Sequence, residues 1–146
     1  MALMHLEVVT AERTVFAGDV NSIVASSVEG KIGILPGHAS LVSLLQPGEL
    51  SIKSGGDERL LFVSGGFLQV FDDEVVILAD ACEYAEEIDI ERAEAARQRA
   101  QDMLEAGGYD IDAAAAEAAL RRSLARLRVA NHRRRAGIDN LPRFSV

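Results

Sequence analysis

Short apolar runs separated by turn residues fill the first 86 residues of the chain. The runs are rich in Val, Ile, Leu and Phe, and pairs of Gly, Pro or Asp stand between them. Runs of this composition bounded by such residues are typical of β-strands. The turns recur about every ten residues, which indicates an all-β sandwich or barrel. The expected strands cover residues 4–10, 21–27, 50–53, 60–63, 67–71 and 75–79.

Six segments supply the turn chemistry between these runs. Gly provides a positive φ and Pro a fixed one, and Asp accepts local hydrogen bonds, so such clusters favour chain reversal. A Gly pair inside a strand, as at Gly65-Gly66, indicates a bulge or a close backbone approach. The expected turns are Ala17-Gly18-Asp19, Glu29-Gly30, Pro36-Gly37, Pro47-Gly48, Gly55-Gly56-Asp57 and Asp72-Asp73.

After Glu83 the spacing of the apolar residues changes from that of strands to that of helices. Gly and Pro are absent until Gly107, and the strong helix formers Ala, Glu, Arg and Gln take over. Asp89 is placed as an N-cap and Gly107-Gly108 as a stop, and a second helix is expected from near Asp112 to about Arg135. The positions expected to face a neighbour are Ile90, Ala93, Arg97, Ala100 and Leu104, then Ala116, Leu120, Leu124, Leu127 and Ala130 or Asn131.

These two periods predict a two-part chain. We expect a β sandwich or barrel over residues 1–86, an α-helical hairpin over 87–135 and an irregular tail over 136–146. A Gly-Gly joint between two amphipathic helices favours the hairpin. Because Ala-on-Ala contacts bury little area, at roughly 25 cal/mol per Å², the packing of these helices should be weak.

The net charge also differs between the two parts of the chain. The chain of 146 residues has a net charge of −8. Residues 1–86 carry 4 basic and 13 acidic residues, a net of −9, and residues 87–146 carry 11 basic and 10 acidic residues, a net of +1. An acidic chain is a poor candidate for binding nucleic acid. The basic segment 121–143, with eight Arg against one acid, predicts an acidic partner.

Several functional classes find no support in the sequence. Gly30-Lys31 resembles the end of a phosphate loop, but Ile32 replaces its Ser or Thr and Ala25 its first Gly. The three His residues lack metal-ligand spacing, and the single Cys82 cannot complete a zinc site and fits a reducing compartment. No apolar run approaches the roughly 20 residues that span a bilayer, and the first ten residues lack the pattern of a secretory signal. We therefore expect no catalytic residue and no metal.

Four segments, in order, resemble the signatures of the epsilon subunit family of F-type ATP synthases. The first is Glu-Gly-Lys-Ile-Gly-Ile-Leu-Pro-Gly-His-Ala at residues 29–39, continuing into Leu41, Leu45, Pro47 and Gly48. The second covers residues 63–70, the third runs from 77–80 to 86–93, and the last is 127–129. The resemblance covers residues 4–134. Each segment is weak alone, and their order over this length makes the signal strong.

The resemblance implies a non-catalytic subunit of a proton-translocating ATP synthase. Such a subunit belongs to the central rotor stalk and couples rotation between the membrane ring and the catalytic head. Its sandwich would bind the gamma subunit and the membrane c-ring, without any required cofactor. Segment 29–45 is expected to be a loop at the sandwich end that meets the ring. The implied contact residues are Glu29, Lys31, Pro36, His38 and Leu41.

The resemblance also implies that the C-terminal helices inhibit ATP hydrolysis. They would extend along the shaft to the catalytic alpha and beta subunits, with ATP as a regulatory ligand of the folded hairpin. Arg122 and Arg126, at i and i+4, can meet phosphates. Asp89 either helps to position the base and ribose or simply caps the helix. The implied ATP-binding residues are Glu83, Asp89, Arg92, Ala93, Arg122 and Arg126, and the inhibitory residues are Arg121, Arg122, Arg126, Arg128, Arg133, Arg134 and Arg135.

Other interpretations stay open on the residues alone. One is a stand-alone ATP-sensing module outside any rotary complex. A second is a small hydrolase that uses His38 and acids, and a third is nucleic-acid binding through Arg133, Arg134 and Arg135, which the net charge disfavours. The family resemblance implies a peripheral position on the cytoplasmic side of a bacterial plasma membrane, with the chloroplast thylakoid as the alternative.

Overall fold

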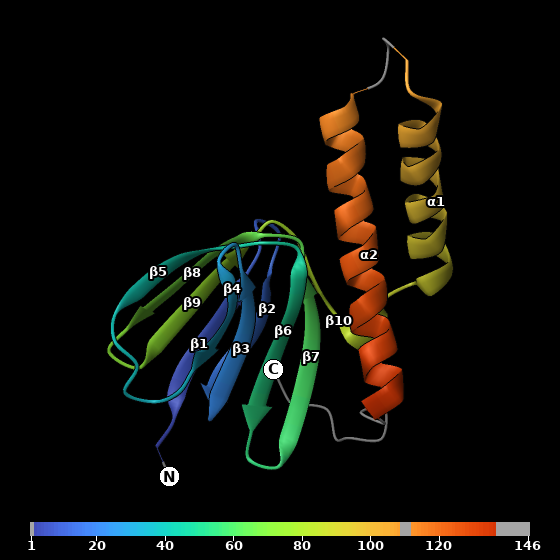
Figure 1. Cartoon of the computed structure of the whole chain (residues 1–146). Helices are drawn as coiled ribbons and strands as arrows, with labels where there is room; N and C mark the ends of the chain where they lie inside the picture. The colour runs from blue at the N-terminus through green and yellow to red at the C-terminus, as the bar shows by residue number, and fades with distance from the viewer. Residues whose placement is uncertain (1, 109–111, 137–146) are drawn as a thin grey trace.

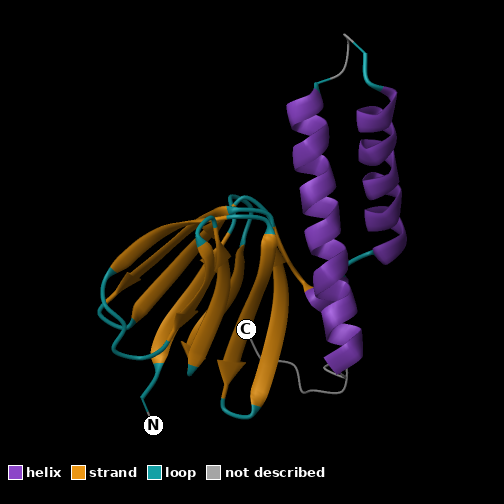
Figure 2. Cartoon of the chain, in the orientation of Figure 1, coloured by secondary structure: helices purple, strands orange, loops and turns teal. Residues whose placement is uncertain are grey.

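The chain folds into a β sandwich followed by two helices that stand beside it (Figure 1). The computed structural model describes residues 2–108 and 112–136, and at 134–136 the description covers the backbone only. All strands precede both helices in the chain (Figure 2). The expected fold class, a sandwich or barrel followed by a helical hairpin, is confirmed.

The described strands form one hydrogen-bonded sheet that folds over to enclose a core. Their order is β10-β7-β6-β3-β5-β8-β9-β1-β2, with β4 paired to β3. All pairings are antiparallel except that of β1 with β9. The strands are β1 Met4–Val9, β2 Thr14–Val20, β3 Ser22–Ser27, β4 Gly30–Ile34, β5 Leu41–Leu45, β6 Gly48–Ser54, β7 Asp57–Val63, β8 Gly66–Phe71, β9 Glu74–Ala79 and β10 Cys82–Tyr84.

Alternating side chains build the core from most strands, but β7 is buried on both faces. In β1 the side chains of Met4, Leu6 and Val8 are buried, as the period of a half-buried strand requires. In β7, Leu61 packs in the sandwich core, whereas Phe62 packs in a second cluster shared with the helices. The outer face of β7 is therefore the surface on which the hairpin docks.

The sequence missed four strands and misplaced one turn. The turn expected at Ala17-Gly18-Asp19 is wrong, because these residues lie inside β2 and Gly18 pairs with Leu6 of β1. The single loop expected over residues 29–45 is also wrong, because it contains β4 and β5. The two Gly residues of β4 pair with β3, which supplies cross-strand hydrogen bonds that the local composition does not reveal.

Both helices lie close to their expected limits. The short 3₁₀ helix η1, Ala85–Glu87, leads into α1, Ile90–Ala106, and α2 spans Ala113–Ala136. The Asp89 side chain accepts a hydrogen bond from the backbone N–H of Arg92, and Gly107 ends α1 with φ of 61°. Neither α1 nor α2, the two α-helices among the described residues, has the length and apolar character needed to cross a bilayer.

The buried surface of α2 is wider than the single stripe expected for it. Leu124, expected to face a neighbour, is 38% exposed, whereas Ala125 and Val129 are buried. The reason is that α2 lies between the sandwich and α1 (Figure 1), so it packs on two neighbours at once. One face meets α1, and the face carrying Ala125 and Val129 covers Phe62 of β7.

Candidate functional site

A groove of about 370 Å³ lies between residues 96–103 of α1 and residues 115–126 of α2. Three guanidinium groups border it, those of Arg99 from α1 and of Arg122 and Arg126 from α2. Because the other lining side chains except Met103 are small, the helices leave room between them for a ligand. Guanidinium groups converging on such a groove are suited to phosphate or carboxylate oxygens. The remaining lining residues are Ala96, Ala100, Met103, Ala115, Ala116, Ala119 and Ser123.

Arg126 is engaged in the folded hairpin. Its Nε donates to the carboxylate of Glu83 on β10, and its guanidinium lies 4.7 Å from the centroid of the Phe62 ring. Arg122, one turn earlier, is exposed and makes no hydrogen bond or ion pair with the described residues. Arg122 therefore has the freer guanidinium, and Arg126 can meet a ligand only by sharing or leaving Glu83.

The residues expected to bind ATP fall into two groups. Glu83 and Arg126 form an ion pair, and Arg126 borders the helical groove together with Arg122. Asp89, Arg92 and Ala93 lie at the first turn of α1, outside the lining of that groove, and Asp89 has the capping role that the sequence left open. Sequence reasoning missed Arg99. It lies three residues after Ala96 and four before Met103, so helical spacing placed it on the groove face.

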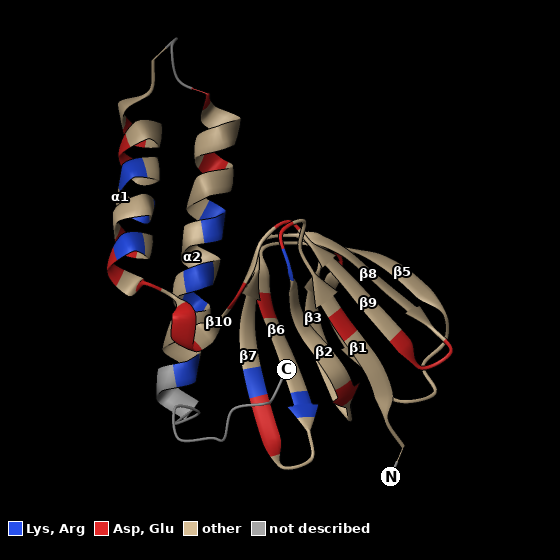
Figure 3. Ribbon diagram, turned by 180° about the vertical axis from the view of Figure 1, so that it is seen from behind, with Lys and Arg blue, Asp and Glu red and all other residues tan. Residues whose placement is uncertain are grey.

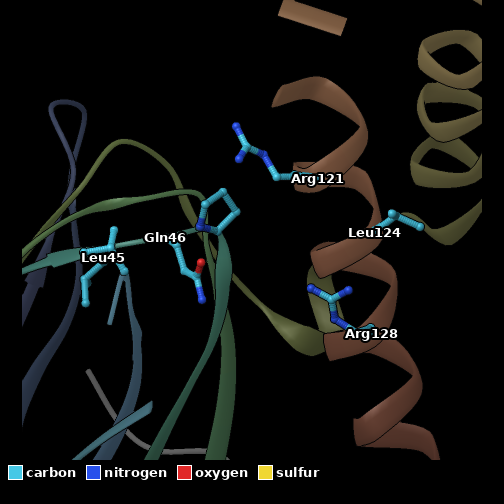
Figure 4. A pocket seen from close by; sticks show the side chains of 7 residues that line it. Leu45, Gln46, Arg121, Leu124 and Arg128 are labelled. Carbon is cyan, nitrogen blue, oxygen red and sulfur yellow. The ribbon is translucent and has the colours of Figure 1, made fainter. Parts of the chain in front are cut away.

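The arginines expected to inhibit differ in what they contact. Figure 3 shows basic residues along successive turns of α2. Arg121 and Arg128 project toward the sandwich, on the side where Leu45 and Gln46 lie (Figure 4), and border a groove of about 390 Å³. Neither makes a hydrogen bond or ion pair with the described residues. Arg133 pairs with Glu86, and the side chains of Arg134 and Arg135 lie outside the described residues.

The residues expected to contact partner subunits lie at opposite ends of β4. Glu29 belongs to the β3–β4 turn and Lys31 to the start of β4, beside α2. Pro36 and His38 lie in the loop after β4, and Leu41 begins β5.

A hydrogen bond from the backbone to an aspartate side chain fixes the loop that carries His38. The backbone N–H of Gly37 donates to Asp73 Oδ1 at 2.7 Å, which ties this loop to the β8–β9 turn. Asp72 and Asp73 adopt φ of 50° and 59°, as a two-residue hairpin turn requires. Leu35 and Phe71 are exposed beside this loop and turn. These segments form one end of the sandwich with large apolar side chains at its surface.

An apolar stripe crosses the outer face of the sandwich, and sequence reasoning did not identify it. Leu44 of β5, Phe67 of β8 and Leu78 of β9 lie directly opposite one another in the sheet. They are 50%, 52% and 54% exposed. A contiguous exposed apolar surface of this kind marks an interaction site. The signal in the sequence was weak, because the apolar residues of β5 occupy both faces of the strand.

Among the described residues, three titratable side chains have clearly shifted pKa values. Burial raises the pKa of the Cys82 thiol to about 12. Burial also raises the pKa of Tyr84, whose hydroxyl donates to the carbonyl of Val15 at 2.7 Å. A hydrogen bond to Asp19 raises the pKa of His5. The Cys82 thiol is thus a poor nucleophile at neutral pH. Within the described part of the chain, no cluster of three acidic, His or Cys side chains could hold a metal ion.

Comparisons with known proteins match both parts of the chain. The family model for "ATP synthase, Delta/Epsilon chain, beta-sandwich domain" matches residues 3–85, and that for "ATP synthase, Delta/Epsilon chain, long alpha-helix domain" matches residues 86–131. The ATP synthase epsilon chain of Dehalococcoides mccartyi is 51% identical over 136 residues, covering 92% of this chain and 97% of that one. The ATP synthase epsilon chain of Chloroflexus aggregans is 47% identical over 127 residues, covering 87% and 91%.

Solved structures show the same fold inside rotary complexes. A chain of the Euglena gracilis mitochondrial ATP synthase OSCP/F1/c-ring structure superposes with a TM-score of 0.76 at 28% identity, covering 86% of this chain and 79% of that one. A chain of the Tetrahymena thermophila mitochondrial ATP synthase central stalk/c-ring structure superposes with a TM-score of 0.55 at 20% identity. It covers 88% of this chain and 94% of that one, and at this identity it shows the fold alone.

Proposed function

The chain belongs to the ATP synthase delta/epsilon family, and from this membership we propose that it is a non-catalytic regulatory subunit of the central rotor stalk of a proton-translocating ATP synthase. The observation that carries the proposal is the apolar stripe of Leu44, Phe67 and Leu78 on a sandwich of this family. The sandwich joins the rotor, and the helical hairpin regulates ATP hydrolysis. The complex lies at the cytoplasmic face of a bacterial plasma membrane.

The two surfaces of the sandwich fit two different partners. The apolar stripe crosses three adjacent strands on the outer face, so it suits the gamma subunit. Covering three large side chains that are about half exposed would contribute roughly 1 kcal/mol each. The sandwich end with Pro36 and His38 exposes Leu35 and Phe71 as well, and this apolar end suits the membrane c-ring.

The length and the charge of the hairpin suit a segment that inhibits ATP hydrolysis. Helices of 17 and 24 residues would extend about 60 Å in line, at 1.5 Å per residue. That length carries the arginines of α2 toward acidic loops of the catalytic alpha and beta subunits. ATP would favour the folded hairpin by binding the groove bordered by Arg99, Arg122 and Arg126, with Arg126 shared between the phosphates and Glu83 so that its ion pair with the sandwich is kept.

Docking of the sandwich can be tested by polar substitution on the stripe. Leu44→Ser combined with Phe67→Ser should weaken binding to a gamma-containing catalytic complex at least tenfold, measured by biolayer interferometry. Val24→Ser is the matched control, because Val24 of β3 is 39% exposed and pairs with Gly33 and Ser51, away from the stripe. If the double variant binds as tightly as the parent chain while the control behaves normally, the docking face is elsewhere.

The nucleotide site is tested by isothermal titration of the full chain with ATP. Arg122→Ala should abolish binding because it removes an exposed guanidinium of the groove that has no partner among the described residues. Arg97→Ala is the control, since Arg97 pairs with Glu94 within α1 and does not border the groove. Equal binding by Arg122→Ala and the parent would place the site elsewhere. A parent chain that binds no ATP at millimolar concentration would leave the hairpin without nucleotide control.

A further inference from the structure

The hairpin is joined to the sandwich through α2, near its C-terminal end. α2 packs on β6, β7 and η1, whereas α1 packs on the side of α2 that faces away from the sheet (Figure 1). Whatever holds the last turns of α2 to the sandwich therefore holds the whole hairpin. The apolar part of this junction is a cluster made of Leu60, Phe62, Ala85, Ile88, Ala125, Val129 and Ala130.

Three carboxylates on the sandwich side meet two arginines and one histidine of α2 around this cluster. Glu83 of β10 pairs with Arg126. Glu86 of η1 pairs with Arg133 at 3.7 Å between Oε2 and Nε. Glu49 of β6 lies 2.7 Å from His132 Nδ1. All three contacts fall within residues 126–133, so the N-terminal half of α2 has no comparable attachment among the described residues.

Glu86 differs from the other two acids because its carboxylate contacts both the sandwich and α2. Its Oε1 accepts from Arg59 of β7 at 2.5 Å, while its Oε2 faces Arg133 of α2. The Glu86 side chain is 14% exposed and that of Arg59 is 8% exposed, and the Arg59 guanidinium lies 4.2 Å from the Tyr84 ring centroid. Arg59 thus fixes the carboxylate in place before α2 docks, which lowers the ordering cost of the second ion pair.

We propose that the ion pairs Glu86–Arg133 and Glu83–Arg126 form a latch, and that breaking it releases α2 and α1 together from the sandwich as the first step of extension. Glu86 is the fixed half of the latch and Arg133 its movable half. This inference rests on the proposed function, in which the extended hairpin regulates hydrolysis. An acidic partner then opens the latch by competition, because Arg126 and Arg133 cannot pair fully with Glu83, Glu86 and the partner at once.

Two exposed arginines of α2 that lie outside these ion pairs provide an internal comparison. Arg121 and Arg128 project toward the sandwich, on the side of Leu45 and Gln46 (Figure 4), but form no ion pair with the described residues. They stand outside the latch and can meet an acidic surface while the hairpin is still closed. Substituting Arg128 removes the same charge from the same helix as substituting Arg133, without breaking an ion pair.

The test is amide hydrogen exchange of the full-length chain at pH 7, comparing Arg133→Gln with Arg128→Gln. Arg133→Gln should lower the protection of α1 and α2 about fivefold, the loss expected for an ion pair worth about 1 kcal/mol. Arg128→Gln should change it less than twofold, and sandwich amides should keep their protection in both. Equal effects of the two substitutions, or none from Arg133→Gln, would overturn the latch.

A second variant tests the fixed half. Glu86→Gln should reproduce the loss of hairpin protection seen in Arg133→Gln, and the two together should lose less than the sum of their separate effects. Additive losses would show that the residues do not act as a pair. Should Glu86→Gln unfold the sandwich by removing the partner of Arg59, Glu83→Gln paired with Arg126→Gln gives the same double-mutant test for the second ion pair.

Inhibition is measured separately, so that the latch and the proposed function can fail independently. In the assembled complex, Arg133→Gln should shift the hairpin toward extension and change hydrolysis by at least twofold relative to Arg128→Gln. Loss of hairpin protection with unchanged hydrolysis would retain the latch and contradict the regulatory role. Changed hydrolysis with unchanged protection would overturn the latch and retain the role.

Discussion

Phe62→Ala separates the stability of the hairpin from that of the sandwich. Phe62 is fully buried, yet it packs in the cluster shared with α2 and not in the sandwich core. Its neighbour Leu61, also fully buried, points into the core. Truncating Phe62 should therefore weaken docking of the hairpin, whereas truncating Leu61 should weaken the sandwich itself.

The expected magnitude follows from the size of the buried ring. Phe→Ala at a fully buried site costs about 3–5 kcal/mol, and here the loss also includes the contact of the Arg126 guanidinium with the ring. A loss of about 3 kcal/mol corresponds to roughly a hundredfold shift toward undocked hairpin. Amide exchange of α2 should accelerate by about that factor, while the thermal midpoint of the sandwich changes by only a few degrees.

A truncated chain ending at Ile88 supplies the control. Without α2, the Phe62 side chain loses its cover, so Phe62→Ala should cost less than about 0.5 kcal/mol in that background. Leu61→Ala should cost about 2–5 kcal/mol in both backgrounds. Equal destabilisation by Phe62→Ala in the full and truncated chains, measured by urea unfolding, would refute the separation of β7 into a core face and a docking face.

Three smaller predictions concern single residues. Asp89→Ala removes the cap of α1 and should cost about 1 kcal/mol, seen as faster exchange confined to the first turn; fraying of the whole helix would contradict it. Gly66→Ala should lower the sandwich midpoint by several degrees, because Gly66 has φ of 141° and an added Cβ would collide with the Leu78 carbonyl oxygen across the β8–β9 pair. An unchanged midpoint would mean that the strands adjust without cost. Cys82 should react with iodoacetamide at pH 8 at least a hundredfold more slowly in the native chain than in urea, because its pKa of about 12 leaves little thiolate. Equal rates would show an exposed thiol.

Local signals were sufficient for the helices and insufficient for several strands. Asp89 and Gly107 set the limits of α1 through hydrogen bonds within a few residues, so the sequence alone placed them correctly. Gly18 lies in β2 only because β1 pairs with it, and Gly30 and Gly33 lie in β4 because β3 does. In each case pairing with a neighbouring strand decides the conformation, whereas the local composition favoured turns.

The candidate site also combines features that the sequence predicted with features that only the fold creates. Helical spacing predicted that Arg122 and Arg126 share a face, and both border the groove. The ion pair of Arg59 with Glu86 joins residues 27 positions apart, and only the folded sandwich brings them together. The exposed position of Phe67 was equally hidden, because alternation along β8 shows that there are two faces without showing which one faces the core.

The most direct test is a titration of a catalytic complex that contains alpha, beta and gamma subunits but lacks this chain. The full chain and the chain ending at Ile88 are added separately, and both binding and ATP hydrolysis are measured. The account predicts that both bind the complex through the sandwich and that only the full chain changes the hydrolysis rate, while neither has ATPase activity alone. Failure of the shorter chain to bind, or an equal change in hydrolysis by both, would contradict a docking sandwich with a regulatory hairpin.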